Sequence, residues 1–148
     1  MKNAKLLDIP MMLSSIPFLV PGSIHWQLGE RFEASMYLAV TITSILSDAV
    51  FCNGNKYDKY TTVLDRIVAS SALIAAIRRG WLARSAIYHR VYLLASVCFA
   101  GMFLLRGRKH MSQGDIAKYR RYHMTWHMCL SIIGYWSATY QRALPTNI

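Results

Sequence analysis

Apolar stretches without charge alternate along the chain with short clusters of charged residues. Four stretches contain no Lys, Arg, Asp or Glu: residues 9–29, 34–47, 91–105 and 122–141. Charged clusters lie at residues 30–33, 53–60, 78–90 and 106–121. The four charged clusters divide the chain into five mostly apolar segments. A helix that crosses a bilayer needs about 20 such residues, so the pattern predicts five transmembrane helices. We expect them roughly at residues 9–27, 32–52, 61–79, 86–106 and 115–140, the first one broken by Pro10, Pro17 and Pro21.

The amino-acid composition favours the same class of protein. Hydrophobic residues make up 54% of the 148 residues and charged residues 16%, an apolar excess over an average soluble domain. The predicted helices leave only short loops, so we expect residues 1–148 to form a single all-α domain, an integral membrane helical bundle. The mean hydropathy of +0.23 is modest for such a protein. It indicates that some helices contain polar groups with a function.

The chain is strongly basic, with 17 Lys and Arg against 7 Asp and Glu. This charge is typical of nucleic-acid binding or of contact with an anionic membrane surface. The long uncharged stretches leave little room for a solvated basic face, so we expect no nucleic-acid partner. We expect the basic fourth loop, residues 106–121, to contact anionic lipid headgroups or another protein subunit. The expected location is the mitochondrial inner membrane or an endomembrane, with the N-terminus on the matrix or cytosolic side.

Five polar residues within the predicted helices are candidates for a functional site. Ser44 and Asp48 stand four residues apart near the end of the second helix and are expected to share a face. Asp65 lies about one turn inside the third helix. His123 and His127 have the same four-residue spacing in the fifth helix. Two imidazoles at that spacing can bind one metal ion when a third ligand comes from elsewhere.

The predicted topology places all five polar residues at one depth. The second helix ends, and the third and fifth helices begin, on the side of the membrane that holds the N-terminus. An unpaired carboxylate within a bilayer costs several kcal/mol, so we expect these side chains to meet. Donor atoms of Asp48, His123 and His127 should surround a common point, with Asp65 within reach through one water molecule.

This ordered set of residues resembles the CREST superfamily of membrane hydrolases, which joins alkaline ceramidases with progestin and adipoQ receptors. The family has Ser-x3-His at the end of one helix, an Asp early in the next and His-x3-His in the last. The matching positions here are Ser44-x3-Asp48, Asp65, His123-x3-His127 and Trp126-His127 with Gly134 after it. The resemblance implies a zinc ion held by three side chains and a water molecule that attacks a lipid amide or ester.

The resemblance also implies a role for each residue. Asp48, His123 and His127 would bind zinc. Asp65 would hold and deprotonate the water, and Ser44 would orient it or stabilise the oxyanion. The chain departs from the family in two respects: Asp48 replaces a histidine, and about five helices replace seven. Asp is an acceptable zinc ligand, whereas a missing helix pair would open the wall of the lipid chamber.

Other interpretations of the same residues remain open at this point. The two histidines of the fifth helix could be core residues bonded to carbonyl groups or to Asp65. Asp65 could pair with Arg66 or with the basic fourth loop. Asp48 could cap the second helix against Lys56 or Lys59.

The sequence therefore supports two leading hypotheses for function. The first is a zinc-dependent lipid amidase or esterase. The second is a non-catalytic accessory subunit that keeps this fold as a scaffold in a larger membrane complex, such as a mitochondrial respiratory-chain or ATP synthase assembly. A small receptor, carrier or channel is a third. In each case we expect membrane lipids as partners, and for the second also other membrane protein subunits.

Overall fold

The computed structural model describes residues 7–50, 58–82 and 87–142, and every regular element in these ranges is a helix. The elements are α1 (Ile9–Ser15), the 3-10 helix η1 (Ile16–Phe18), α2 (Leu19–Gln27), α3 (Arg31–Ile45), the π-helix η2 (Leu46–Val50), α4 (Asp58–Leu82), α5 (Ile87–Ser112) and α6 (Ile116–Arg142). Since α1, η1 and α2 follow one another directly, and η2 continues α3, these elements form five helical stretches at the predicted positions. The all-α class is confirmed.

Of the three prolines predicted to break the first stretch, only Pro17 lies at a break; Pro10 lies at the start of α1, and α2 continues through Pro21. Pro10 lies in the first turn of α1, where its missing N–H has no helical partner to lose. Asp8 caps this turn and accepts a hydrogen bond from the backbone N–H of Met11 at 3.5 Å. Pro17 lies in η1, the tighter turn that separates α1 from α2. The break in the first helix therefore falls at Ile16–Phe18.

The prediction that residues 106–121 form a loop is wrong for most of these residues. α5 continues through the basic residues, and only three residues separate it from α6. Lys and Arg are good helix formers, so their charge alone does not end a helix. Gly114 ends α5 with a φ of 75°, and the Asp115 carboxylate caps α6 by accepting from the backbone N–H of Lys118 at 3.1 Å. Hydrogen bonds from Lys118 hold the pKa of Asp115 below its ordinary value.

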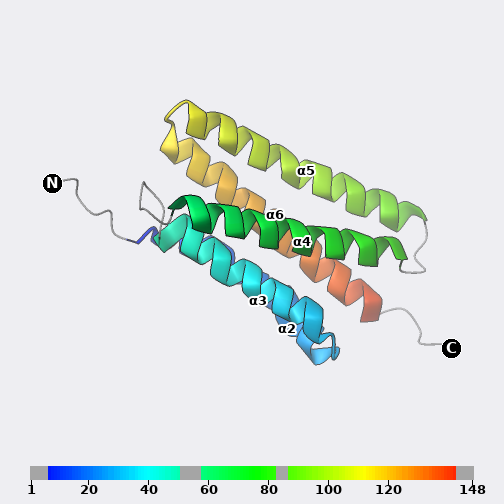
Figure 1. The fold of residues 1–148 in the computed structure, drawn as a ribbon. Coiled ribbons are helices and arrows are strands. Elements are labelled where there is room, and N and C mark those ends of the chain that lie inside the picture. The colour runs from blue at the N-terminus through cyan, green and yellow to red at the C-terminus, as the bar shows by residue number, and fades with distance from the viewer. Residues whose placement is uncertain (1–6, 51–57, 83–86, 143–148) are drawn as a thin grey trace.

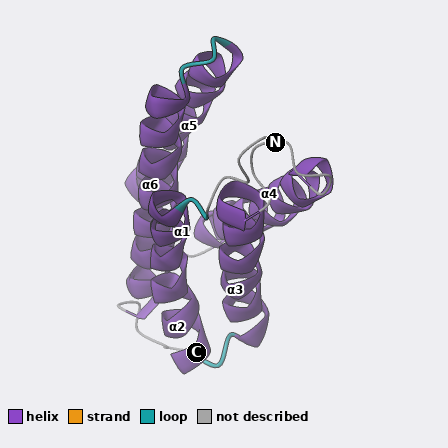
Figure 2. Cartoon of the chain, turned by 90° about the vertical axis from the view of Figure 1, so that its left-hand side faces the viewer, coloured by secondary structure: helices purple, strands orange, loops and turns teal. Residues whose placement is uncertain are grey.

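The helices form a bundle in which one end gathers the elements of the candidate site. α5 packs along α6, α2 along α3, and α3 against α4. In the view of Figure 2, α5 and α6 form one side of the bundle, and α3 and α4 form the other. The backbone N–H of Asp8 donates to the carbonyl of Ala49 at 3.1 Å, which ties the start of α1 to η2. The beginnings of α4 and α6 lie at the same end (Figure 1), as the predicted topology requires.

The Tyr37 side chain of α3 reaches across to α6 in the middle of the bundle. Tyr37 clusters with Phe18 and Val40, and its ring lies directly over Gly134. A Cβ atom at position 134 would lie 2.6 Å from the Tyr37 hydroxyl oxygen, so only glycine permits this contact. Leu93 and Ile133 belong to a second cluster between α5 and α6.

Two helices are long and apolar enough to cross a membrane. They are the segments Lys59–Arg78 of α4 and His89–Ser112 of α5, each with a mean hydropathy of 1.4. Large apolar side chains of α4 point outward, with Ile67 59% and Ile74 66% exposed. Such side chains suit contact with lipid better than contact with water.

Candidate metal centre

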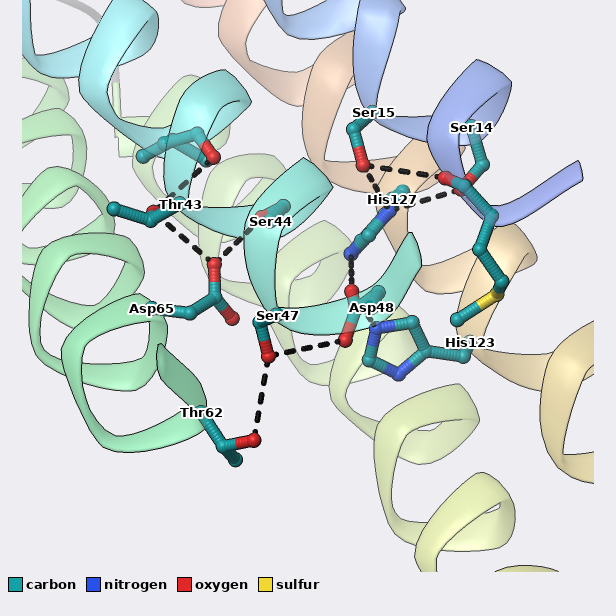
Figure 3. Close-up of polar contacts among 12 residues, drawn as sticks. Ser14, Ser15, Thr43, Ser44, Ser47, Asp48, Thr62, Asp65, His123 and His127 are labelled. Carbon is teal, nitrogen blue, oxygen red and sulfur yellow. Dashed lines mark hydrogen bonds and ion pairs between the residues drawn. The ribbon is translucent and has the colours of Figure 1, made fainter. Parts of the chain in front are cut away.

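The structure brings Asp48, His123 and His127 together. One possible ligand atom from each residue lies within 4.8 Å of the other two. Nε2 of His123 lies 2.9 Å from Oδ2 of Asp48, and Nε2 of His127 lies 3.6 Å from the same oxygen. Figure 3 shows the three side chains converging from η2 and α6. The three residues thus form a compact group of two imidazoles and one carboxylate.

Local helix geometry explains why these side chains meet. His123 and His127 are one turn apart on α6, and their ring centroids are 4.6 Å apart. Asp48 lies in the π-helix η2, whose wider turn changes the direction of its side chain relative to an α-helix. Ser44, four residues earlier, instead contacts Asp65. Ser44 and Asp48 thus contact different partners, Asp65 and the two histidines, and the chain changes between them from the α-helix α3 to the π-helix η2.

Two serines of α1 fix the orientation of the His127 ring. His127 is 3% exposed, and its Nδ1 lies 3.1 Å from the Ser14 hydroxyl and 3.3 Å from the Ser15 hydroxyl. Ser14 donates its single proton to the carbonyl of Met11 at 2.7 Å. The Ser14 oxygen must then accept a proton from Nδ1 of His127. This assigns the proton to Nδ1 and leaves the lone pair of Nε2 facing Asp48.

The resulting arrangement fits a bound cation. A lone pair and a carboxylate oxygen 3.6 Å apart repel each other unless a positive charge lies between them. A tetrahedral zinc site with bonds of about 2.1 Å places neighbouring ligand atoms about 3.4 Å apart. The separations of 2.9 and 3.6 Å bracket this value. Two imidazoles and one carboxylate also leave the fourth position of such a site open, as hydrolytic zinc centres do.

Removing the two α1 serines should weaken metal binding. Because Ser14 and Ser15 hold the tautomer and the orientation of His127, the double variant Ser14→Ala, Ser15→Ala is expected to bind zinc about 10- to 100-fold less tightly. Competition with a fluorescent zinc chelator measures this change. Ser23→Ala is the matched control, because Ser23 is exposed and, among the described residues, bonds only to the carbonyl of Val20. Equal zinc affinities in both variants would contradict the assigned role.

Asp65 lies beside this group and is held by two hydroxyl groups of α3. Its Oδ1 accepts hydrogen bonds from Ser44 at 2.7 Å and from Thr43 at 3.2 Å. Within the described residues Asp65 forms no ion pair, so the alternative salt bridge to Arg66 is not present. Ser44 donates its proton to Asp65 and thus orients this carboxylate. It would have to break that bond to stabilise an oxyanion as the resemblance implies.

The other alternative interpretations receive no support in the described part of the chain. The ring nitrogens of the two histidines contact Asp48 and the α1 serines, with no backbone carbonyl or Asp65 among their hydrogen-bond partners there. Lys59 forms no ion pair with Asp48 among the described residues. Lys56 lies outside the described residues.

A cavity of about 380 Å³ opens onto the group. Its polar lining includes the three candidate ligands and Asp65, and its apolar wall includes Phe18, Trp126 and Leu130. Three arginines also line it: Arg66, Arg108 and Arg120. The cavity therefore combines three side chains that could bind a metal ion, the carboxylate of Asp65, basic side chains and an apolar surface.

Sequence reasoning missed several residues of this site. Ser14 and Ser15 lie 113 and 112 residues from His127, so no local spacing connects them. A pair of adjacent serines in an apolar helix was the available signal. The ion pair between Asp8 and Arg120, 2.5 Å between Oδ2 and Nη2, joins α1 to α6 and has no sequence signature.

Comparisons with protein families, with characterised proteins and with solved structures give no match to this chain.

Proposed function

We propose that this protein is a membrane-embedded, zinc-dependent hydrolase of lipid amide or ester bonds. The observation that carries the proposal is the convergence of Asp48, His123 and His127 within 4.8 Å at a cavity with an apolar wall. In this proposal all five helical stretches span the membrane, two of which, α4 and α5, have the length and hydropathy of spans by themselves. The resemblance of the ordered motif to the CREST hydrolases supports the same reaction.

Each polar group of the site has a role in the proposed reaction. Asp48, His123 and His127 would hold a zinc ion, which when bound would polarise the carbonyl group of the lipid and make water a stronger acid. Asp65 accepts a proton from the attacking water and passes it to the leaving amine or alcohol. Ser44 and Thr43 hold the Asp65 carboxylate in place for both transfers.

The apolar wall gives the acyl chain of the substrate a place beside the metal. Phe18 and Trp126 line the cavity close to His127, and the Phe18 ring contacts the His127 ring edge-on at 5.5 Å between centroids. Burial of apolar surface there stabilises a bound chain by about 25 cal/mol per Å². The carbonyl group of such a lipid would lie at the boundary between the apolar wall and the metal.

Removal and replacement of the metal tests the proposal. The full chain in phosphatidylcholine nanodiscs, loaded with zinc, is expected to release fatty acid from lipid amides or esters. Treatment with a strong chelator should abolish release, and added Zn²⁺ should restore it. Mg²⁺ should not, because it prefers oxygen ligands to imidazole. Release that is unaffected by zinc removal, or no release from any lipid with zinc bound, would contradict the proposal.

The outward apolar side chains of α4 favour a second candidate, an accessory subunit of a larger membrane complex. Neighbouring helices could cover Ile67 and Ile74 as well as lipid could. In that case the chain would retain zinc without hydrolysing lipid and would be isolated with other subunits. The nanodisc assay, combined with identification of copurified chains, separates the two candidates.

A further inference from the structure

The cavity beside the metal centre contains basic side chains that neither the metal nor the proposed hydrolysis uses. Arg66 comes from α4, Arg108 from α5 and Arg120 from α6, and all three line the cavity that also holds Asp48 and His123. Arg120 is paired with Asp8 at 2.5 Å. Within the described residues, Arg66 and Arg108 have no hydrogen-bond or ion-pair partner. Both side chains are exposed at the cavity, so their guanidinium groups can reach a ligand bound there.

The charges around the cavity favour an anion. Its lining contains three carboxylates, those of Asp8, Asp48 and Asp65, and three guanidinium groups. These formal charges cancel, and the two histidines are neutral as metal ligands. A bound Zn²⁺ would then leave an excess of two positive charges next to an apolar wall. Because excess charge at such a wall is costly, a ligand with one or two negative charges compensates it better than a neutral lipid does.

The type of basic residue and the size of the cavity narrow the class of ligand. Arginine binds phosphate oxygens in pairs through its planar fork of N–H donors. The volume of about 380 Å³ corresponds to about a dozen water molecules at ~30 Å³ each. This space holds a headgroup and the first part of an acyl chain, and the rest of a long chain would extend between the helices into the bilayer.

We infer that the substrate of the proposed hydrolase is an amphiphile with a phosphate-bearing headgroup, whose phosphate is held by Arg66 and Arg108. This inference rests on the proposed function and adds the chemical class of its substrate. The phosphate would lie against α4 and α5, and the acyl carbonyl would face Asp48 and the two histidines. A neutral lipid amide would leave both guanidinium groups unpaired.

Direct binding of dodecyl phosphate tests the inference without measuring turnover. The zinc-loaded full chain is kept in dodecyl maltoside micelles, which contain no phosphate or acyl ester, and bound tritiated dodecyl phosphate is counted by scintillation proximity, with protein-free micelles as the blank. Arg66→Gln and Arg108→Gln are each expected to weaken binding about tenfold, the usual effect of losing one charged hydrogen bond. Arg106→Gln is the matched control for Arg108→Gln. Like Arg108, Arg106 is an exposed arginine of α5, but it does not line the cavity.

Competition distinguishes a lipid headgroup from free phosphate. Unlabelled dodecyl phosphate should displace the probe at least tenfold more effectively than dodecanol, which has the same chain without charge, or than inorganic phosphate. Equal competition by dodecanol or by inorganic phosphate would overturn the inference, as would equal binding to the Arg108→Gln and Arg106→Gln variants.

Zinc content is measured on the same samples, so the two proposals fail in different ways. If zinc stays bound but the arginine substitutions do not weaken binding of dodecyl phosphate, only the inferred substrate class is refuted. If no zinc is bound but the arginine substitutions still weaken binding of dodecyl phosphate, the proposed hydrolase is refuted and the phosphate-binding site remains.

Discussion

The His127→Ala variant is expected to lose both its bound zinc and all hydrolysis. In the proposed centre His127 would supply one of three ligands, and the Ser14 and Ser15 hydroxyls of α1 contact its Nδ1. Two remaining ligands, Asp48 and His123, bind zinc much more weakly than three. We expect zinc affinity to fall by more than about 100-fold, since removing a mere outer-shell partner costs 10- to 100-fold. Metal analysis after gel filtration, together with the lipid release assay, measures both effects.

A second buried histidine provides a control for damage to the fold. His25 is 3% exposed and bonds to Glu30 at 2.5 Å, at the other end of α2 from the site. His25→Ala therefore removes an equally buried imidazole and should keep zinc bound. Asp48→Asn, which preserves side-chain shape, should lose zinc as His127→Ala does. Zinc retained at full stoichiometry in both His127→Ala and Asp48→Asn would refute the metal centre.

The helical organisation could be predicted because charge and hydropathy follow the helices closely. A proline of the first stretch marked its break, uncharged segments marked the second, fourth and fifth stretches, and the flanking charged clusters marked the third. The error at the α5–α6 turn arose because charge marks the edge of the apolar region without ending a helix. Gly114 and Asp115 were the better signals, since one ends α5 and the other caps α6.

The candidate site could be predicted only where its residues are neighbours in sequence or share a bundle end. The spacing of His123 and His127 placed them on one face of α6, and the topology placed Asp48 at the same depth. The π-helical turn that redirects Asp48 depends on how η2 packs, which no spacing reveals. The contact of Ser14 with His127 depends on the packing of α1 against α6.

Replacing Asp65 by asparagine should separate chemistry from metal binding. Asn has the shape of Asp and can still accept the hydrogen bonds from Ser44 and Thr43 at Oδ1. It cannot accept a proton from the attacking water. We therefore expect zinc content to remain unchanged while kcat for lipid hydrolysis falls about 10²- to 10⁴-fold, the usual contribution of a general base.

Comparison with a second carboxylate makes the Asp65 result specific. Asp115→Asn changes an acidic residue in the α5–α6 turn that does not line the cavity, and it should leave both kcat and zinc content unaltered. If Asp65 only held α3 to α4, Asp65→Asn would preserve kcat, since the amide oxygen keeps the bonds to Ser44 and Thr43 of α3. A kcat that falls with stability and zinc content intact instead requires the carboxylate itself to take up a proton. Measuring kcat, thermal stability and zinc content together therefore decides whether Asp65 takes a proton from the attacking water or only holds α3 to α4.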